Sequence, residues 1–252
     1  MSHQKERLFG LIGHPLGHSF SKKYFSEKFR EEGLRDCRYE LFPLSDIAAL
    51  PQLLAAHPGL CGLNVTIPHK QRVIPFLHEM EAEASAAGAV NCIRINGGRL
   101  TGYNTDIFGF EQSLQRFLSG LRPVQSLILG TGGAARAVAY VFKKLDLPYR
   151  FVSRHSQPGM LTYEDLTAEV VDGSPLVVNA TPLGTFPNVE ECPPIPYHCL
   201  TREHLLFDLV YNPQKTLFLA RGEARGARIS NGLEMLHLQA EKAWEIWNEA
   251  AG

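Results

Sequence analysis

The sequence contains no apolar run long enough to cross a bilayer, and its first residues lack the hydrophobic centre of a secretory signal peptide. It also lacks a surplus of charge of one sign. The 25 basic and 26 acidic residues leave a formal net charge of −1, so no overall field favours nucleic acid or an anionic membrane. We therefore expect neither a membrane protein nor a nucleic-acid-binding protein.

Cysteine is scarce, odd in number and scattered along the chain. No two cysteines have the spacing of zinc ligands, so we expect free thiols in a reducing cytoplasm and no metal site. The five are Cys37, Cys61, Cys92, Cys192 and Cys199. The length of 252 residues and a hydrophobic content of 44% allow one large domain or two modest ones.

The clearest motif is a glycine-rich turn between an apolar run at 127–129 and a helix-forming stretch at 137–142. Gly130, Gly132 and Ala135 have the G-x-G-x-x-G/A spacing of dinucleotide-binding turns. Glycine lets such a turn close and lets the backbone approach a pyrophosphate, whose charge then meets the free N–H groups of the helix start. A strand-to-helix turn without a ligand has the same appearance, so the spacing alone decides nothing.

The next predicted strand, 147–154, adds a second signal. An NAD-binding unit places an acid at the end of this strand for the ribose hydroxyl, whereas this chain has Ser153 and Arg154 there. A carboxylate would repel the 2′-phosphate of NADP, and a guanidinium can bind that phosphate with two hydrogen bonds. These residues favour NADP over the alternative that Arg154 is an ordinary surface arginine.

Two serines mark the start of a helix predicted to run to about residue 32. Ser19 and Ser21 lie at its entrance, after a short apolar strand at 7–13. One of them could simply cap the helix, or the two hydroxyls and the free N–H groups could hold a small carboxylate. The sequence leaves these two interpretations even.

Another strand of this N-terminal region, 62–68, is predicted to end in Pro68 at the first position of a further helix. That helix would begin His69-Lys70-Gln71-Arg72 with no acid in its first turn. Because the helix dipole disfavours cations there, the pattern suggests a site in which Lys70 exchanges protons. The alternative is an exposed surface lysine.

A hairpin is predicted at 89–95 and 99–103, followed by a helix at about 107–118. Asp106 precedes that helix and could be only its N-cap, although the helix would connect the first region to the nucleotide unit. Gln239, in the predicted last helix at about 232–248, lies off the apolar stripe, and such a glutamine is usually solvated.

Taken together, these motifs resemble the shikimate dehydrogenase family over nearly the whole chain. The glycine turn is shared with many oxidoreductases. The combination of the Asn-Val-Thr-x-Pro-x-Lys block with Asn-Thr-Asp and the Met-Leu-x-x-Gln ending is far more specific. The matching segments are 17–21, 64–70, 88–91, 102–106, 130–135, 179–182, 207–213 and 232–239.

The resemblance implies an α/β fold with two domains. An N-terminal α/β substrate domain (1–105), completed by the C-terminal helix (232–252), would be joined to a Rossmann-type NADP-binding domain (106–231). It implies reversible, NADPH-dependent reduction of 3-dehydroshikimate to shikimate in aromatic amino-acid biosynthesis, by a cytoplasmic monomer or homodimer.

The resemblance also assigns residues to roles. Lys70 and Asp106 would be the catalytic pair. The substrate would be bound by Ser19, Ser21, Asn64, Thr66, Asn91, Tyr211 and Gln239. The NADP site would be lined by Gly130, Thr131, Gly132, Gly133, Ala134, Ser153, Arg154, Thr181, Leu209 and Gly232.

The chain departs from the family pattern at three places. Lys22 replaces a proline after the second serine, Ile107 replaces a glycine after Asp106, and no second basic residue follows Arg154. The last departure favours a quinate or shikimate dehydrogenase with loose cofactor choice as an alternative. A related Rossmann enzyme such as a methylene-tetrahydrofolate dehydrogenase would not need the paired serines. A non-catalytic sensor of shikimate-like ligands would not need both Lys70 and Asp106.

Overall fold

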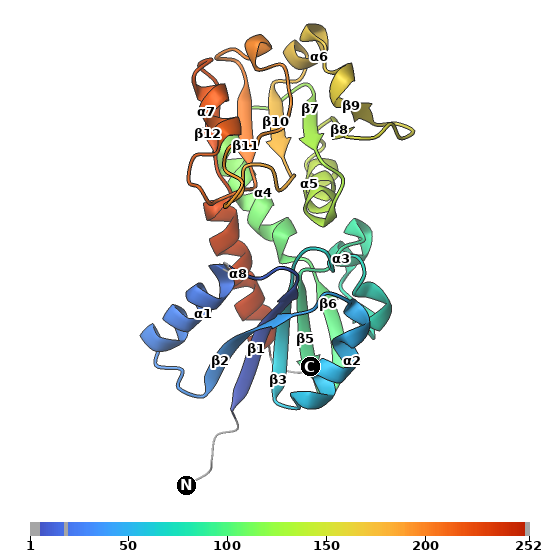
Figure 1. Ribbon diagram of the computed structural model, residues 1–252, viewed down its shortest axis with the longest axis vertical. Helices are drawn as coiled ribbons and strands as arrows, with labels where there is room; N and C mark the ends of the chain where they lie inside the picture. The colour runs from blue at the N-terminus through green and yellow to red at the C-terminus, as the bar shows by residue number, and fades with distance from the viewer. Residues whose placement is uncertain (1–5, 18–19, 250–252) are drawn as a thin grey trace. The chain divides into compact units, whose positions relative to one another are not determined.

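The computed structural model describes residues 6–17 and 20–249, and this part of the chain forms two compact units (Figure 1). The first unit consists of the described residues up to Thr105 together with those from Ala240 onwards, and Asp106–Gln239 form the second. Both are α/β units, as the sequence predicts.

The first unit is built on a mixed six-stranded sheet with the order β2-β1-β3-β5-β6-β4. Strand β1 pairs in parallel with both β2 and β3, whereas β3, β5 and β6 pair antiparallel with one another. The predicted hairpin is β5–β6, with Asn96 opposite Arg99. The strands are β1 (Arg7–Gly13), β2 (Cys37–Pro43), β3 (Leu60–Val65), β4 (Glu79–Met80), β5 (Cys92–Asn96) and β6 (Arg99–Tyr103).

Helices cover both faces of this sheet because alternate strand residues are apolar on each face. Phe9 and Leu11 of β1 pack on one face with α1 (Phe20–Glu31) and the end of α8 (Leu233–Asn248). Ile12 packs on the other face with a core that includes residues of α2 (Leu50–Ala56) and α3 (Ala82–Ala87).

On the first face, the end of the C-terminal helix α8 packs closely against β3 and β5. The Trp247 indole donates a hydrogen bond to the Ile93 carbonyl at 3.0 Å. A Cβ on Gly62 would lie 2.3 Å from the Trp247 ring, so only glycine fits at this point of β3. The last turns of the chain are therefore an integral part of the first unit's core.

The second unit is a fully parallel six-stranded sheet with the order β12-β11-β10-β7-β8-β9. Numbered within the unit, this order is 6-5-4-1-2-3, the Rossmann arrangement, so the predicted fold class is confirmed. The strands are β7 (Ser126–Leu129), β8 (Tyr149–Ser153), β9 (Leu161–Thr162), β10 (Leu176–Asn179), β11 (Leu205–Asp208) and β12 (Arg228–Ser230).

The central strands of this sheet are buried throughout, as expected for a parallel sheet with helices on both faces. The second unit's helices are α4 (Thr105–Leu118, entering from the first unit), α5 (Gly133–Lys144), α6 (Ala168–Asp172), α7 (Leu217–Glu223) and the first part of α8. Phe110 of α4 packs edge-on against Phe207 of β11, with 5.3 Å between ring centroids.

Helix α8 belongs to both units. Its first half lies against α4, where a Cβ on Gly109 would come within 2.6 Å of the Met235 carbonyl oxygen and where Arg116 pairs with Glu234. Its second half supplies Ala240, Ala243 and Trp247 to the first core. The compact units thus divide inside α8, whereas the predicted functional domain boundary at 232 stays a prediction.

One predicted helix is wrong. Residues 67–73 form consecutive turns, followed by the short 3-10 helix η2 (Ile74–Phe76), and no α-helix begins at Pro68. The Ile67–Pro68 peptide bond is cis, and only Val73 N–H bonds to a carbonyl four residues back, that of His69. Pro75 lies where a continuing helix would need another N–H donor, so the segment cannot extend as a helix.

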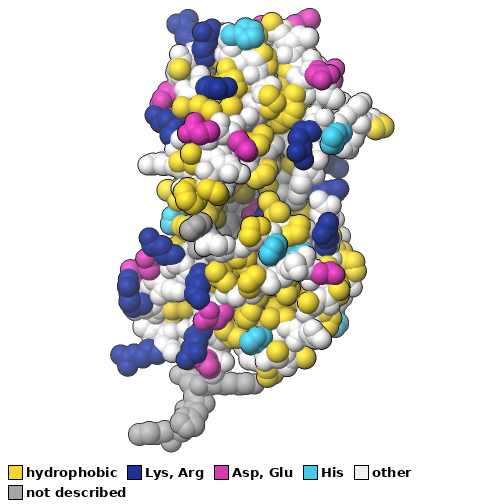
Figure 2. All heavy atoms as spheres, viewed as in Figure 1, with side chains coloured by type: hydrophobic (Ala, Val, Ile, Leu, Met, Phe, Trp, Pro, Cys, Tyr) yellow, Lys and Arg dark blue, Asp and Glu magenta, His cyan; other side chains and the backbone are white. Residues whose placement is uncertain are grey.

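The face shown in Figure 2 carries charged side chains of both signs. Charged side chains of the chain form ion pairs within one unit, such as Lys144 with Glu111 and Lys215 with Glu223. Exposed pairs of this kind contribute little to stability. Within residues 6–17 and 20–249, no helix is both long and apolar enough to cross a membrane.

Candidate functional site

The predicted substrate residues of the first unit lie at one edge of its sheet, where β1 and β3 end. Ser21 is in the first turn of α1, which follows β1, and Asn64 is near the end of β3. Asn91 immediately precedes β5, and its carbonyl accepts a hydrogen bond from Val65 N–H at 2.8 Å. Ser19 lies outside the described residues. The sheet thus brings Ser21, Asn64 and Asn91 to the same edge.

A buried tyrosine connects two of these residues. The Tyr39 hydroxyl donates to Asn64 Oδ1 at 2.7 Å, and the Ser21 hydroxyl is hydrogen-bonded to the same phenol. Burial raises the pKa of Tyr39 well above its usual value, so the phenol remains a donor at any working pH. Because its oxygen is held by Tyr39, the Asn64 amide is fixed in orientation, with its NH₂ group 3.4 Å from the Asn91 carbonyl.

The same polar row continues from Asn91 to the start of α4. Asn91 Oδ1 accepts from Thr105 N–H at 2.7 Å, and its amide nitrogen donates to Thr105 Oγ1 at 3.0 Å. Asp106 follows Thr105 and lies inside the first turn of α4, where the helix dipole favours a carboxylate. Asp106 is therefore not an N-cap, and the residue is buried, with 6% relative exposure.

Lys70 lies in the turns at 67–73, so the argument from a helix dipole does not apply to it. The backbone of these turns is nevertheless well fixed. The Lys70 carbonyl accepts from Val90 N–H at 2.7 Å, and the fully buried His69 bonds through Nε2 to the Leu44 carbonyl at 2.7 Å. His69 holds the turn that presents Lys70, a contact that no local sequence pattern signals.

The position of Thr66, which follows β3, depends on a glycine in the neighbouring strand β1. Its N–H donates to the Ile12 carbonyl at 2.9 Å, and a Cβ on Gly13 would lie 2.3 Å from the Thr66 methyl group. The missing side chain at Gly13 therefore lets Thr66 approach β1.

We expect Tyr39→Phe to raise about tenfold the KM for the substrate that this polar row is predicted to bind, while leaving the KM for the predicted dinucleotide unchanged. The ring would keep its stacking on Phe25, at 4.7 Å between centroids, whereas the Asn64 amide would lose its fixed orientation. Steady-state kinetics would measure both constants. Tyr197→Phe is the matched control, because it removes a phenol of the second unit that is hydrogen-bonded to the Pro193 carbonyl and to the Cys192 side chain. Equal KM values for that substrate in the wild type and in Tyr39→Phe would contradict the expectation.

In the second unit, the predicted cofactor residues follow the carboxyl ends of parallel strands. Ligands of open α/β sheets bind at this edge, beside the point where the strand order reverses, which here lies between β7 and β10. The glycine turn follows β7, Ser153 and Arg154 stand at the end of β8, Thr181 follows β10, Leu209 follows β11 and Gly232 follows β12.

Gly130 and Gly132 have different structural roles in the turn. Gly130 has φ +103°, and a Cβ there would lie 3.0 Å from the Thr181 methyl group, so the turn itself requires glycine. Gly132 is the N-cap of α5 in extended geometry, and a Cβ there would meet nothing within 4 Å among the described residues. The protein's own packing does not demand glycine at 132, whereas close approach of a pyrophosphate would.

The third position of the fingerprint, Ala135, is fully buried on α5, which is the position where a small residue permits close packing of helix and strand. Thr131 precedes the helix, and Gly133 and Ala134 form its first turn, where N–H groups have no partner within the helix. The turn therefore has the form of an anion site at a helix start.

Ser153 and Arg154 differ in exposure. Ser153 is buried and its hydroxyl accepts from His155 N–H at 3.2 Å, which closes the chain after β8. Arg154 is exposed, and its positive charge lies near the Tyr163 phenol, where it opposes the rise in pKa that burial causes there. The arginine can thus reach a ligand at the carboxyl edge of β8.

Asp208, at the end of β11, is fully buried, and this burial raises its pKa to about 7. An unfolded aspartate titrates near 3.8. The folded chain therefore keeps a proton that the unfolded chain releases, so stability falls as the pH rises from about 4 to about 7.

We expect Asp208→Asn to remove this dependence. Between pH 5 and 7, the unfolding free energy of the wild type should fall relative to that of Asp208→Asn by up to about 1.4 kcal/mol per pH unit. Urea unfolding of both chains at several pH values measures the difference. A constant difference across that range would refute the expectation.

Three predicted site residues belong to the second unit: Asp106, Tyr211 and Gln239. Tyr211 is half-buried in the loop after β11. Gln239 is buried, which corrects the expectation that it is solvated, because α8 lies against α4 at Gly109. Its amide nitrogen donates to the Leu236 carbonyl at 3.0 Å.

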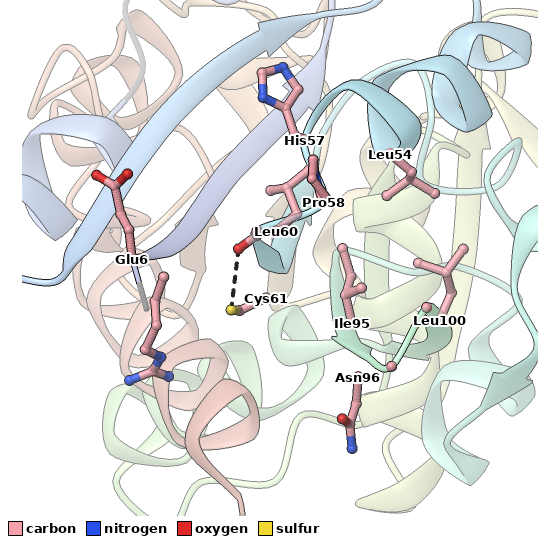
Figure 3. Close-up of a pocket in the computed structure, with 13 residues that line it drawn as sticks. Glu6, Leu54, His57, Pro58, Leu60, Cys61, Ile95, Asn96 and Leu100 are labelled. Atoms are coloured by element: carbon pink, nitrogen blue, oxygen red, sulfur yellow. Dashed lines mark hydrogen bonds between the residues drawn. The ribbon is translucent and has the colours of Figure 1, made fainter. Parts of the chain in front are cut away.

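A pocket of about 560 Å³ opens elsewhere on the first unit (Figure 3). It is lined by residues at the amino ends of β1 and β3 and by the β5–β6 turn, at the sheet edge opposite the polar row. Its charged residues are engaged, Arg7 with Asn248 and Glu6 with Arg38. We assign no function to this pocket. In the described part of the chain, no three His, Cys, Asp or Glu side chains form a metal site.

A Rossmann-type unit with a glycine turn, joined to an α/β unit with a buried polar row, defines a two-domain dehydrogenase. A sequence profile of the shikimate dehydrogenase substrate binding domain matches residues 11–93. The NADP-dependent shikimate dehydrogenase of Desulforamulus reducens is 36% identical over 96% of this chain and 90% of its own length. The chain therefore belongs to the shikimate dehydrogenase family.

Solved structures agree with this assignment. A shikimate dehydrogenase from Thermus thermophilus in complex with NADP(H) and shikimate is 31% identical, with a TM-score of 0.83, over 96% of this chain and 93% of that one. A quinate dehydrogenase from Corynebacterium glutamicum in complex with NAD is 28% identical, with a TM-score of 0.84, over 97% and 94% of the two chains.

Proposed function

We propose that this chain is an NADP-dependent shikimate dehydrogenase, which reversibly reduces 3-dehydroshikimate to shikimate in aromatic amino-acid biosynthesis. The observation that carries the proposal is the buried polar row from Ser21 through Tyr39, Asn64 and Asn91 to Thr105. Fixed amides and hydroxyls of this kind suit a small ring with several hydroxyl groups, because a site built to hydrogen-bond such groups rejects analogues that lack them.

In this proposal the substrate carboxylate is bound by Ser19, Ser21 and Tyr211. Asn64, Thr66, Asn91 and Gln239 contact the ring hydroxyls or the ketone. The support is that hydrogen bonds within the protein fix the orientation of both the Asn64 and the Asn91 amide.

Lys70 and Asp106 are the proposed catalytic pair. As the ketone is reduced, its oxygen gains negative charge and must receive a proton. The Lys70 ammonium stabilises that charge and donates the proton, and Asp106 accepts hydrogen bonds from Lys70 and from the hydroxyl once it has formed. A close pair titrates jointly, so the proton belongs to the pair rather than to one member.

The residues at the carboxyl edge of the second sheet fit a dinucleotide, because Gly130 and Gly132 leave the start of α5 open to a pyrophosphate. We propose that the glycine turn holds the pyrophosphate and that Arg154 binds the 2′-phosphate. Thr181, Leu209 and Gly232 line the remainder of the site. When bound, NADPH supplies the hydride.

Arg154→Ala should raise the KM for NADP about 10- to 100-fold and leave the KM for NAD almost unchanged. The expected loss is that of charge-assisted hydrogen bonds to a phosphate that NAD lacks. Arg150→Ala is the matched control, because Arg150 is an exposed arginine of the same strand. Equal losses with both cofactors would show that Arg154 does not select NADP.

A quinate or shikimate dehydrogenase that also uses NAD is the second candidate. It is favoured by the single basic residue at the end of β8 and by the likeness to the quinate dehydrogenase in complex with NAD. Initial rates of shikimate and quinate oxidation, each with NADP and with NAD, decide between the two.

NADP preference confined to shikimate supports the proposed function. Comparable rates with NAD or quinate establish the second candidate. Binding of shikimate without turnover would identify a sensor, and turnover of a folate substrate alone would identify a methylene-tetrahydrofolate dehydrogenase.

We propose further that the enzyme works in the cytoplasm as a monomer or homodimer. The five cysteines are free thiols, which supports a reducing compartment. Light scattering coupled to size-exclusion chromatography gives the assembly state.

A further inference from the structure

Asp208 is a buried acid that the proposed chemistry does not use. Its side chain is fully buried at the end of β11, and within residues 6–17 and 20–249 no lysine, arginine or histidine forms an ion pair with it. Burying a carboxyl group without a cation costs free energy, so the burial of Asp208 calls for an explanation, and its hydrogen bonds provide one.

Three segments at the carboxyl edge of the sheet converge on this carboxyl. The Asn179 amide at the end of β10 donates to Oδ1 at 2.9 Å, and Val210 N–H donates to the same oxygen at 3.0 Å. The Thr216 hydroxyl, at the N-cap of α7, donates to Oδ2 at 2.6 Å. Asp208 thus joins the loops that follow β10 and β11.

Asn179 extends this network to a proposed cofactor residue. Its Oδ1 accepts from the Thr181 hydroxyl at 2.6 Å and from Thr181 N–H at 3.0 Å, while its backbone carbonyl accepts from Leu209 N–H at 3.0 Å. The amide group of Asn179 is therefore fixed at both ends, by Asp208 and by Thr181.

We infer that Asp208 is a positioning residue of the cofactor site. Through Asn179 it sets the orientation of Thr181, and through Val210 N–H it sets the loop that carries Leu209. The inference rests on the proposed function, which places Thr181 and Leu209 against NADP.

The test compares NADP affinity in variants that break the network from either end. Asp208→Ala and Asn179→Ala should each raise the Kd for NADP about tenfold, because Thr181 loses its fixed orientation. Asp208→Asn should stay within about twofold of the wild type. Its oxygen can still accept from Asn179 and Val210, and its NH₂ can donate to Thr216 Oγ1.

His204, immediately before the same strand, provides the matched control. It is buried just before the amino end of β11 and bonds to the Val171 carbonyl at 3.1 Å, at the sheet edge opposite Asp208. His204→Ala should lower the melting temperature without changing the Kd for NADP, which separates positioning from loss of stability.

Fluorescence titration with NADP, with circular dichroism to measure the folded fraction, gives the result. Unchanged affinity in folded Asp208→Ala and Asn179→Ala would overturn the inference while leaving the proposed function in place. If Asp208→Ala does not fold, Asn179→Ala decides alone. A folded wild type that binds no NADP would overturn the proposed function, and this inference with it.

Discussion

Replacing Lys70 by alanine is expected to lower kcat for shikimate oxidation by about 10²- to 10⁴-fold, the range typical of a lost acid–base group. The KM for shikimate should change only a few-fold, because the lysine acts mainly on charge that develops during the reaction. The turn that presents Lys70 should persist in the variant, since it is held by His69 and by Val90 N–H rather than by the lysine side chain.

Arg72→Ala is the matched control for this experiment. Arg72 is an exposed cation in the same turns, so its loss changes the local charge by the same amount. Steady-state rates of both variants, measured with NADP at saturation, separate a specific role from a general effect of charge. Normal turnover by Lys70→Ala, or an equal loss in Arg72→Ala, would remove Lys70 from the proposed mechanism.

Gly232→Ala should destabilise the second unit by more than about 3 kcal/mol, because a Cβ would lie 2.1 Å from the Leu209 carbonyl oxygen and 2.6 Å from its carbon. The backbone at Leu209 cannot easily move aside, since Leu209 N–H bonds to the Asn179 carbonyl and Val210 N–H to Asp208. Urea unfolding followed by circular dichroism measures the loss.

Gly132→Ala is the matched comparison, with the opposite expectation. Its Cβ would meet no described atom within 4 Å and its backbone is extended, so the unfolding free energy should change by less than about 1 kcal/mol. NADP affinity should nevertheless fall strongly, because the added methyl group would keep the pyrophosphate from the backbone. Comparable losses of stability in the two variants would contradict this assignment of the two glycines.

The Rossmann unit could be predicted from sequence because its signals are local. Short apolar runs such as 127–129 end in glycine, and the helix that follows has a regular apolar face. These signals survive in a single sequence, since each strand and turn is specified within a few residues.

The turns at 67–73 show where local reasoning fails. Pro68 fits the first position of a helix, but Pro75 and the bond from buried His69 to Leu44 determine what the segment does. The hydrogen bond between His69 and Leu44 joins residues 25 positions apart, so no pattern within the segment could reveal it.

The candidate site likewise has features that local sequence patterns predict and features that only the structure shows. The motifs that contain Asn64 and Asn91 are visible in the sequence, whereas Tyr39 looks like an ordinary residue of β2. Its role follows from a hydrogen bond across the sheet to Asn64. Asp208 did leave a sequence signal, an acid within the apolar run 205–210, but only the packed structure shows which loops it joins.

Helix α8 has a consequence for synthesis on the ribosome, because the chain emerges from its N-terminus and domains generally fold as units. All residues of the second unit, up to Gln239, have been made before the residues from Ala240 onwards that complete the first core. Until Trp247 emerges, the aromatic face formed by Phe9, Phe25 and Tyr39 lacks the indole ring that packs on it. In the nascent chain, the sequence of the second unit is therefore complete before that of the first unit, although translation of the first unit begins earlier.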